Sequence, residues 1–179
     1  MNLLEKLSQY LPSNELEIAF RDEILTFLKT AQAPYCRSNR SGHITGSALL
    51  IHPDGTKFLL MHHRKLDKWL QPGGHCDGDE NVLNVAIKEA QEESGIQSIT
   101  PITEDIFDVD VHLIPANSRD EAHYHYDVRF LLKAGVDRLI QNHESKELRW
   151  VELSNYQELD LMPSIQRLAH KACSFLKEA

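Results

Sequence analysis

The sequence has few cysteines and no long apolar run. Its three cysteines, Cys36, Cys76 and Cys173, are odd in number and widely spaced, which argues against a disulfide framework and against a zinc-ribbon cluster. No stretch approaches the ~18 consecutive apolar residues of a membrane-spanning helix. The first 20 residues mix acidic and apolar side chains, unlike a signal peptide. These absences predict a protein of the cytoplasm with reduced thiols.

Basic residues are outnumbered by acidic ones. The 179 residues include 19 Lys and Arg against 27 Asp and Glu, a formal net charge of −8. Such a chain has no general attraction to nucleic-acid phosphates or to anionic membranes, so neither is predicted as a stable partner. The 41% hydrophobic and 26% charged residues are typical of one globular domain of this length.

The hydrophobic pattern changes period twice along the chain. It predicts helices over about 3–30 with a break near Pro12, a terminal helix over about 163–177, and between them strands at 44–51, 57–63, 105–114, 123–132 and 147–153. We expect an α+β fold, with a mixed β-sheet in an α/β/α sandwich. The expected single domain has an N-terminal helical extension (1–40), a core (41–154) and a C-terminal helix (155–179).

One predicted helix, within the stretch GGHCDGDENVLNVAIKEAQEESGI (73–96), is unusually acidic. At 100° per residue Glu89, Glu92 and Glu93 share an arc of about 100°. A separate arc carries the apolar residues Leu83, Ile87 and Ala90. Asp79 is the expected N-cap and Gly95 the expected C-terminal glycine.

Carboxylates at this spacing repel one another. Glu89 and Glu93 are four residues apart, which costs stability unless a cation lies among them. Oxygen ligands clustered in this way suit Mg²⁺ or Mn²⁺. A solvated helix face is the simpler interpretation, and the three glutamates alone do not exclude it.

The spacing around the glutamates is more specific. Five residues separate Gly74 from Glu80, seven separate Glu80 from Lys88, and the chain continues as Lys-Glu-Ala-Gln-Glu-Glu-Ser-Gly-Ile to Ile96. This resembles the Nudix box, with Lys88 in place of the usual Arg and the small Ala90 at a bulky apolar position. The resemblance extends more loosely over about 43–153 and leaves both terminal helices outside.

The resemblance implies roles for the residues of the box. Glu89, Glu92 and Glu93 would bind Mg²⁺ or Mn²⁺, the carbonyl of Gly74 would add a ligand, and Glu89 would be a candidate base. Lys88 would retain a charge partner with looser orientation than an Arg gives. Glu80 and Gly95 would organise the box.

The resemblance also implies a function. The chain would be a metal-dependent hydrolase that cleaves the diphosphate linkage of a small nucleoside diphosphate-X or nucleoside triphosphate substrate by water attack at phosphorus, and it is compatible with a homodimer. Two alternatives stay open: a non-hydrolytic sensor of a nucleotide metabolite, and an isoprenoid diphosphate isomerase, which the complete box disfavours.

A second polar constellation lies in HYHYDVRFLL. On an extended strand His123, His125, Asp127 and Arg129 share one face. We expect this row to contact substrate phosphates or an additional metal, although each histidine taken alone fits an exposed sheet face. Arg64, in the basic run before the box, is a further phosphate candidate. An acidic ligand from outside the box is left open between Asp127, Glu144 and Glu147.

Overall fold

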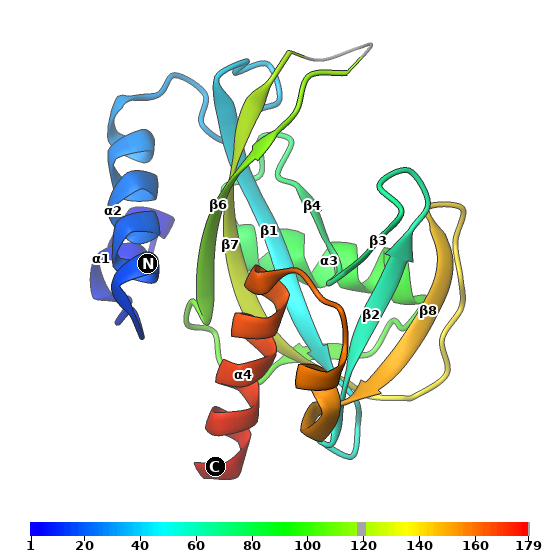
Figure 1. Cartoon of the computed structure of the whole chain (residues 1–179). Coiled ribbons are helices and arrows are strands. Elements are labelled where there is room, and N and C mark those ends of the chain that lie inside the picture. The colour runs from blue at the N-terminus through cyan, green and yellow to red at the C-terminus, as the bar shows by residue number, and fades with distance from the viewer. Residues whose placement is uncertain (118–120, 179) are drawn as a thin grey trace.

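The computed structural model describes residues 1–117 and 121–178. It contains the expected succession of helices, strands, an acidic helix, strands and a final helix (Figure 1). The helices are α1 (Leu3–Gln9), α2 (Glu15–Thr30), α3 (Val82–Ser94) and α4 (Pro163–Glu178), with a 3-10 turn, η1 (Leu153–Glu158). The strands are β1 (Gly42–Ile51), β2 (Lys57–His63), β3 (Lys68–Leu70), β4 (Gly73–His75), β5 (Ile99–Pro101), β6 (Asp108–Ile114), β7 (His123–Ala134) and β8 (Ser145–Glu152).

The centre of the sheet is a parallel pair, β1 and β7. Their register runs from Gly42 opposite Tyr124 to Ile51 opposite Lys133. The other pairings are antiparallel: β6 and β5 lie beside β7, β4 and β2 beside β1, and β8 and β3 beside β2. The sheet is therefore mixed, as expected.

The short strands β3, β4 and β5 were not predicted. Each has three residues, too few for a hydrophobic period to be detected. Their pairing is set by the neighbouring strands rather than by their own composition. β4 matters most for function, because it consists of the glycines and the histidine with which the acidic motif begins.

Side chains on β1 and β7 alternate between two apolar clusters. Ile44, Leu50 and Val128 belong to a cluster that also contains α3, whereas Leu49 and Leu131 pack with α4. Strand geometry produces this division, because successive side chains point to opposite faces. α3 and α4 thus cover opposite faces of the sheet (Figure 1), which confirms the sandwich.

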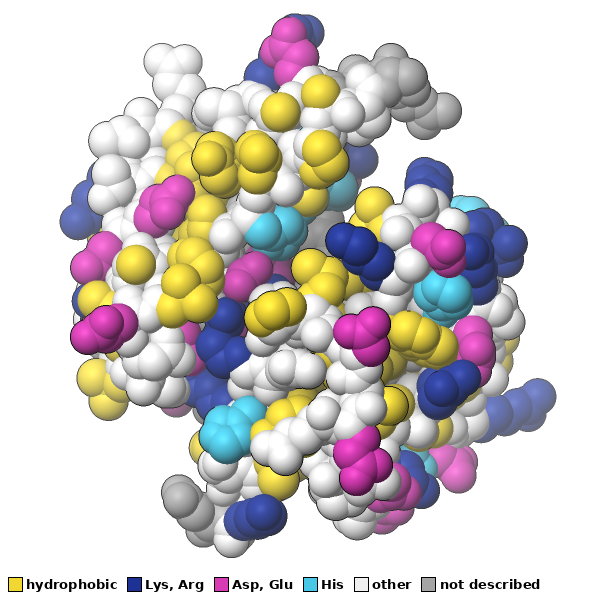
Figure 2. All heavy atoms as spheres, in the orientation of Figure 1, with side chains coloured by type: hydrophobic (Ala, Val, Ile, Leu, Met, Phe, Trp, Pro, Cys, Tyr) yellow, Lys and Arg dark blue, Asp and Glu magenta, His cyan; other side chains and the backbone are white. Residues whose placement is uncertain are grey.

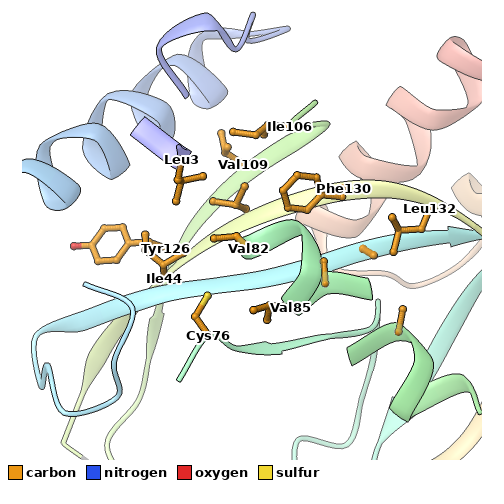
Figure 3. Packing of buried hydrophobic residues seen from close by; sticks show 14 of the residues in the cluster. Leu3, Ile44, Cys76, Val82, Val85, Ile106, Val109, Tyr126, Phe130 and Leu132 are labelled. Carbon is orange, nitrogen blue, oxygen red and sulfur yellow. The ribbon is translucent and has the colours of Figure 1, made fainter. Parts of the chain in front are cut away.

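The N-terminal helices share the α3-side core. Leu3 and Leu7 of α1 and Ile24 of α2 are buried in it, and Phe27 stacks on Tyr126 of β7 with ring centroids 4.0 Å apart. Figure 3 shows side chains of this cluster that belong to α1, to α3 and to the strands between them. The N-terminal helices therefore share the hydrophobic core of the domain.

A buried ion pair joins α2 to α4. The Glu17 side chain has no exposed surface and accepts hydrogen bonds from Lys171 Nζ at 2.8 Å, Tyr10 Oη at 2.5 Å and Ser13 N at 3.0 Å. Burial raises the pKa of Glu17, but these hydrogen bonds outweigh it and leave the pKa below its ordinary value.

The ends of α3 are defined by local hydrogen bonds. The expected cap, Asp79, is wrong: Asn81 Oδ1 accepts from Asn84 N at 3.2 Å, and Asp79 instead accepts from Asn81 N. Asn81 directly precedes the first helical residue, which is the position where a side-chain oxygen reaches a free N–H. Gly95 ends the helix as expected, with a left-handed φ of 76°.

No helix in the described part of the chain combines the length and apolar character needed to cross a bilayer.

Replacing Lys171 should destabilise the fold, because it leaves Glu17 as a buried charge with fewer partners. We expect Lys171→Met to lower the free energy of unfolding by about 2–3 kcal/mol at pH 7. The effect should shrink in acid, because a carboxyl whose folded pKa is lowered contributes its stability above the unfolded pKa and loses it as pH falls through the folded value. Urea unfolding at pH 7 and pH 4 measures the free energy of unfolding of the wild type and the variant. Lys177→Met, at an exposed position, is the control. Equal free energies of unfolding for wild type and Lys171→Met at pH 7 would contradict the ion-pair role.

Candidate functional site: the glutamates of α3 and the cavity beside β4

The three glutamates of α3 differ in exposure. Glu93 is 3% exposed and accepts a hydrogen bond from Gly73 N at 3.1 Å. Glu89 is half-buried, and the Glu92 side chain is 57% exposed. The three carboxylates therefore extend from the protein interior to the surface. An ion bound by them would be accessible to a ligand that arrives from solvent.

Glu89 and the loop strand β4 are in close contact. A Cβ atom on Gly74 would lie 2.5 Å from Glu89 Cδ and 2.6 Å from its Oε2, so any side chain at 74 would displace the carboxylate. This is a physical reason for glycine at this point of the motif. The Gly74 backbone and the Glu89 carboxylate are therefore brought together, as the resemblance implied.

Burial raises the pKa values of two of these carboxyls. Desolvation raises the pKa of Glu93 to about 8; the Gly73 N–H opposes this, while the charges of Glu89 and Glu144 add to it. Desolvation and the charge of Glu92 also raise the pKa of Glu89. A cation beside these groups would favour their ionised forms, so the residues present fit a divalent ion held by oxygen ligands.

Lys88 does not join the carboxylates closely. Its Nζ lies 3.7 Å from Glu92 Oε1, and both side chains are largely exposed. This is a solvated i,i+4 pair worth a few tenths of a kcal/mol. Glu80 is also exposed; its charge reaches Tyr35, whose pKa is raised to about 12 chiefly by burial.

Of the three acidic residues considered outside the motif, Glu144 is the one whose charge contributes to raising the pKa values of both Glu89 and Glu93. Its loop is fixed to α3 by Asn142 Nδ2, which donates to the Glu92 carbonyl at 3.1 Å. Glu147 instead forms an ion pair with Arg149.

Arg64 holds the loop that carries Glu144. Its Nε donates to the His143 carbonyl at 3.0 Å, its Nη2 donates to the Ser145 carbonyl at 2.9 Å, and its backbone N donates to the Glu144 carbonyl at 2.8 Å. These contacts give Arg64 a positioning role for the loop. The residue is also exposed, so the expected contact with phosphate stays a prediction.

The expected row on β7 divides in two. Asp127 and Arg129 are 3% and 2% exposed. Asp127 accepts from Thr45, Ser47 and Arg129, and Arg129 also pairs with Asp108 and Asp110. The expected substrate contact is therefore corrected for these two residues: the guanidinium is shielded from solvent and its charge is balanced by three carboxylates. A sequence cannot reveal this, because the partners come from β1 and β6.

His123 and His125 instead join an imidazole cluster at the start of β7. The cluster consists of His43, His75, His112, His123 and His125, with ring centroids of neighbouring members 4.9–5.5 Å apart. The odd-numbered positions of β1, β4 and β7 bring His43, His75 and His125 to the face opposite α3. Sequence reasoning missed His43, His75 and His112, because the parallel β1–β7 register that aligns His43 with His125 leaves no local signal.

A cavity of about 610 Å³ opens beside the imidazole cluster. Figure 2 shows the surface hollowed between the β6–β7 hairpin and the β2–β3 turn, with histidine side chains at its wall. The lining includes His43, His75, His123 and His125, and the basic residues Arg37, Arg40 and Lys65. Gly74 and His75 are consecutive residues of β4 whose side-chain positions lie on opposite faces of the sheet. Gly74 lies against the glutamates and His75 lines the cavity, so the two features are one residue apart in the sequence.

Three rings of the cluster, those of His43, His75 and His125, are favoured in the neutral form by their surroundings. Desolvation, followed by the neighbouring imidazoles His75 and His43, lowers the pKa of His125 to about 2. Desolvation also lowers the pKa of His75 to about 4 and that of His43 below its ordinary value. These rings therefore offer lone pairs rather than positive charge near neutral pH.

A family model matches most of the chain. The family model described as NUDIX domain matches residues 43–172. The match includes most of α4, which corrects the expectation that both terminal helices lie outside the resemblance; α4 supplies the cover of one face of the sheet.

Three relatives illustrate the likeness. The chain is 30% identical over 136 residues to "Putative 8-oxo-dGTP diphosphatase 3" of Mycobacterium tuberculosis, which covers 68% of this chain and 58% of that protein, so the chain spans less than two thirds of that relative's length. A C. elegans Ap4A hydrolase binary complex has a TM-score of 0.55 at 21% identity, covering 76% of this chain and 98% of that one. The NUDIX domain of Shewanella oneidensis NrtR complexed with ADP ribose has a TM-score of 0.56 at 17% identity, covering 84% and 97%. The two structures show a shared fold.

Glu93→Gln should stabilise the metal-free protein at alkaline pH. A carboxyl with a raised folded pKa favours the fold below its unfolded pKa of 4.5 and loses that contribution as pH rises to about 8. In EDTA at pH 9 we expect the variant to be more stable by on the order of 2–4 kcal/mol and at pH 5 to match wild type. Chemical denaturation measures the difference in the free energy of unfolding between the variant and the wild type. Glu92→Gln, at an exposed position, is the control. Addition of Mg²⁺ should reduce the difference. A variant less stable than wild type at pH 9 would contradict the burial argument.

Proposed function

Since the chain belongs to the Nudix family, we propose that it is a divalent-metal-dependent pyrophosphohydrolase acting on a nucleotide with a diphosphate linkage. The observation that carries the proposal is the graded glutamate cluster of α3, in which buried Glu93 and half-buried Glu89 lie against the glycine backbone of β4. A structural helix gains nothing from carboxyls buried without cationic partners, whereas an ion site needs them.

The proposed ligands are Glu89, Glu92, Glu93 and the carbonyl of Gly74. When bound, Mg²⁺ or Mn²⁺ supplies charge neutralisation of the diphosphate and acidification of water. Glu93 is fixed by the Gly73 N–H, and Glu89 is fixed by its contact with Gly74. Glu92 and Lys88 lie at the solvent-facing end.

The proposed reaction is hydrolysis at phosphorus. A water oxygen forms the new bond to phosphorus, the bond from that phosphorus to the bridging oxygen breaks, and the leaving phosphate carries away the bridging oxygen with its electron pair. One water proton passes to a carboxylate, for which Glu89 is our candidate, and Glu144 provides additional negative charge beside it. Two phosphorylated products result, or pyrophosphate from a triphosphate.

The cavity beside β4 is the proposed place for the rest of the substrate. Its size suits a nucleotide, and Arg40 and Lys65 at its wall suit phosphate. The names of similar proteins include 8-oxo-dGTP, Ap4A and ADP ribose, and all three are nucleotides with phosphoanhydride or diphosphate linkages. That shared chemistry is the substrate class we propose.

Cys76, the cysteine within the motif, does not suit cysteine-dependent isomerisation of a diphosphate. Cys76 is 4% exposed in the apolar core, and desolvation raises the pKa of its thiol to about 12. A buried neutral thiol of this kind is unsuited to proton exchange with a ligand. Hydrolysis therefore remains the proposed chemistry.

Turnover of a nucleotide panel tests the function. With Mg²⁺ or Mn²⁺ we expect release of phosphorylated products from at least one nucleoside diphosphate conjugate or triphosphate, and a fall in kcat of about 10²–10³-fold or more in Glu93→Gln. Glu147→Gln, whose side chain is paired with Arg149, is the matched control. If the wild type hydrolyses nothing but a panel member raises its melting temperature, the protein is a nucleotide-binding sensor.

Glu144→Gln tests the acidic residue outside the motif. Because Glu144 adds negative charge beside Glu89 and Glu93, we expect its neutralisation to lower kcat by about 10–100-fold with little change in KM. Arg64→Met should cause a smaller fall in kcat, since it loosens the loop without removing the charge. Unchanged turnover in Glu144→Gln, measured at saturating metal, would remove Glu144 from the site.

A further inference from the structure

We propose that the imidazole cluster is a second metal site, in which His43, His123 and His125 bind a divalent transition metal such as Zn²⁺. The site is formed by β1 and β7 on the face of the sheet opposite α3 and opens into the cavity described above. Its ligands are nitrogens rather than the carboxylate oxygens of α3.

The geometry of these three residues suits one ion. One ligand atom from each of His43, His123 and His125 lies within 4.8 Å of the other two. Four nitrogens at Zn–N distances of 2.0–2.1 Å are separated from one another by about 3.3 Å in a tetrahedral site. Binding of one ion therefore requires the three rings to rotate toward a common point.

Unpartnered buried nitrogens give independent support. His43 is 3% exposed, and neither of its ring nitrogens makes a well-formed hydrogen bond, although the Asn39 backbone approaches closely enough to raise the pKa of the ring. His125 Nε2 is buried and unpartnered as well. Each such atom costs about 1–3 kcal/mol in a fold that leaves it unbound. A metal ion takes one nitrogen of each ring and removes that cost for the coordinated atom.

One of the three ligands, His123, has a partner of the kind that orients histidines at metal sites, and a neighbouring ring, that of His112, has another. His123 Nδ1 lies 2.8 Å from the Glu121 carbonyl, an arrangement that places the proton on Nδ1 and leaves Nε2 for the ion. His112 Nδ1 lies 3.0 Å from Asp110 Oδ2, and its ring lies 5.5 Å from that of His125. Carbonyl and carboxylate partners of this kind are typical of histidines at metal centres.

The donor set also identifies the class of ion. Imidazole binds Zn²⁺ and its transition-metal neighbours, whereas Mg²⁺ prefers carboxylate and water. Three protein ligands leave a coordination position for water or for an anionic oxygen of a cavity ligand. His75, whose ring centroid lies 5.0 Å from those of both His43 and His125, is a candidate further donor.

Zinc binding by tag-free protein tests the proposal. Isothermal titration with Zn²⁺ and absorption spectra of the Co²⁺-substituted protein should show one equivalent with imidazole ligation in the wild type and in Glu93→Gln. The double variant His123→Asn/His125→Asn should bind at least about tenfold more weakly. His143→Asn, whose side chain is 89% exposed, is the matched control and should bind as wild type.

Three results would overturn the proposal: no stoichiometric Zn²⁺ binding by the wild type, undiminished binding by the double variant, or loss of the equivalent in Glu93→Gln, which would assign the ion to α3. Melting temperatures of the metal-free proteins distinguish a variant that folds poorly from one that has lost a ligand. If the double variant is destabilised, His123→Asn alone is used instead, and we expect the same weakening of Zn²⁺ binding. These readouts do not use turnover, so they stand or fall separately from the hydrolase function.

Discussion

The parallel pairing of β1 with β7 is the constraint on which the other features depend. Ten aligned residue pairs impose one alternation on both strands, so that an apolar row faces α3 and a mixed row faces α4. Within the mixed row, position along the strand decides environment: imidazoles at the start, Asp127 and Arg129 in the middle, and Leu131 beyond them. A register shift of one residue would exchange the two faces and would bury the charges against α3.

Local signals made much of this structure predictable. The period-two runs and the helix signals located the long strands and all four α-helices, and the spacing from Gly74 to Ile96 identified the site motif. What failed depended on contacts between distant segments. Arg129 looked like a phosphate ligand until Asp108 and Asp110 of β6 balanced its charge. His43 gave no signal in the sequence, because its neighbouring rings come from β4 and β7.

The fold contains two kinds of buried polar group, those with a partner of opposite charge and those without one. Around Arg129 and Glu17, opposite charges meet directly and hydrogen bonds complete their shells, which serves stability. Around Glu93 and His43, like groups are gathered without opposite partners. Such arrangements are unfavourable in an isolated domain and become favourable on binding a ligand, so the contrast distinguishes structural networks from candidate sites without reference to any motif.

The bridge between Glu17 and Lys171 has a consequence for how this chain changes during evolution. It connects the N-terminal helices to α4, so the two ends of the sequence form one structural unit although they are 154 positions apart. Substitution of either residue alone leaves an uncompensated charge between two helices. The N-terminal extension is therefore not a module that recombination can exchange freely among relatives, and residues 17 and 171 should vary together.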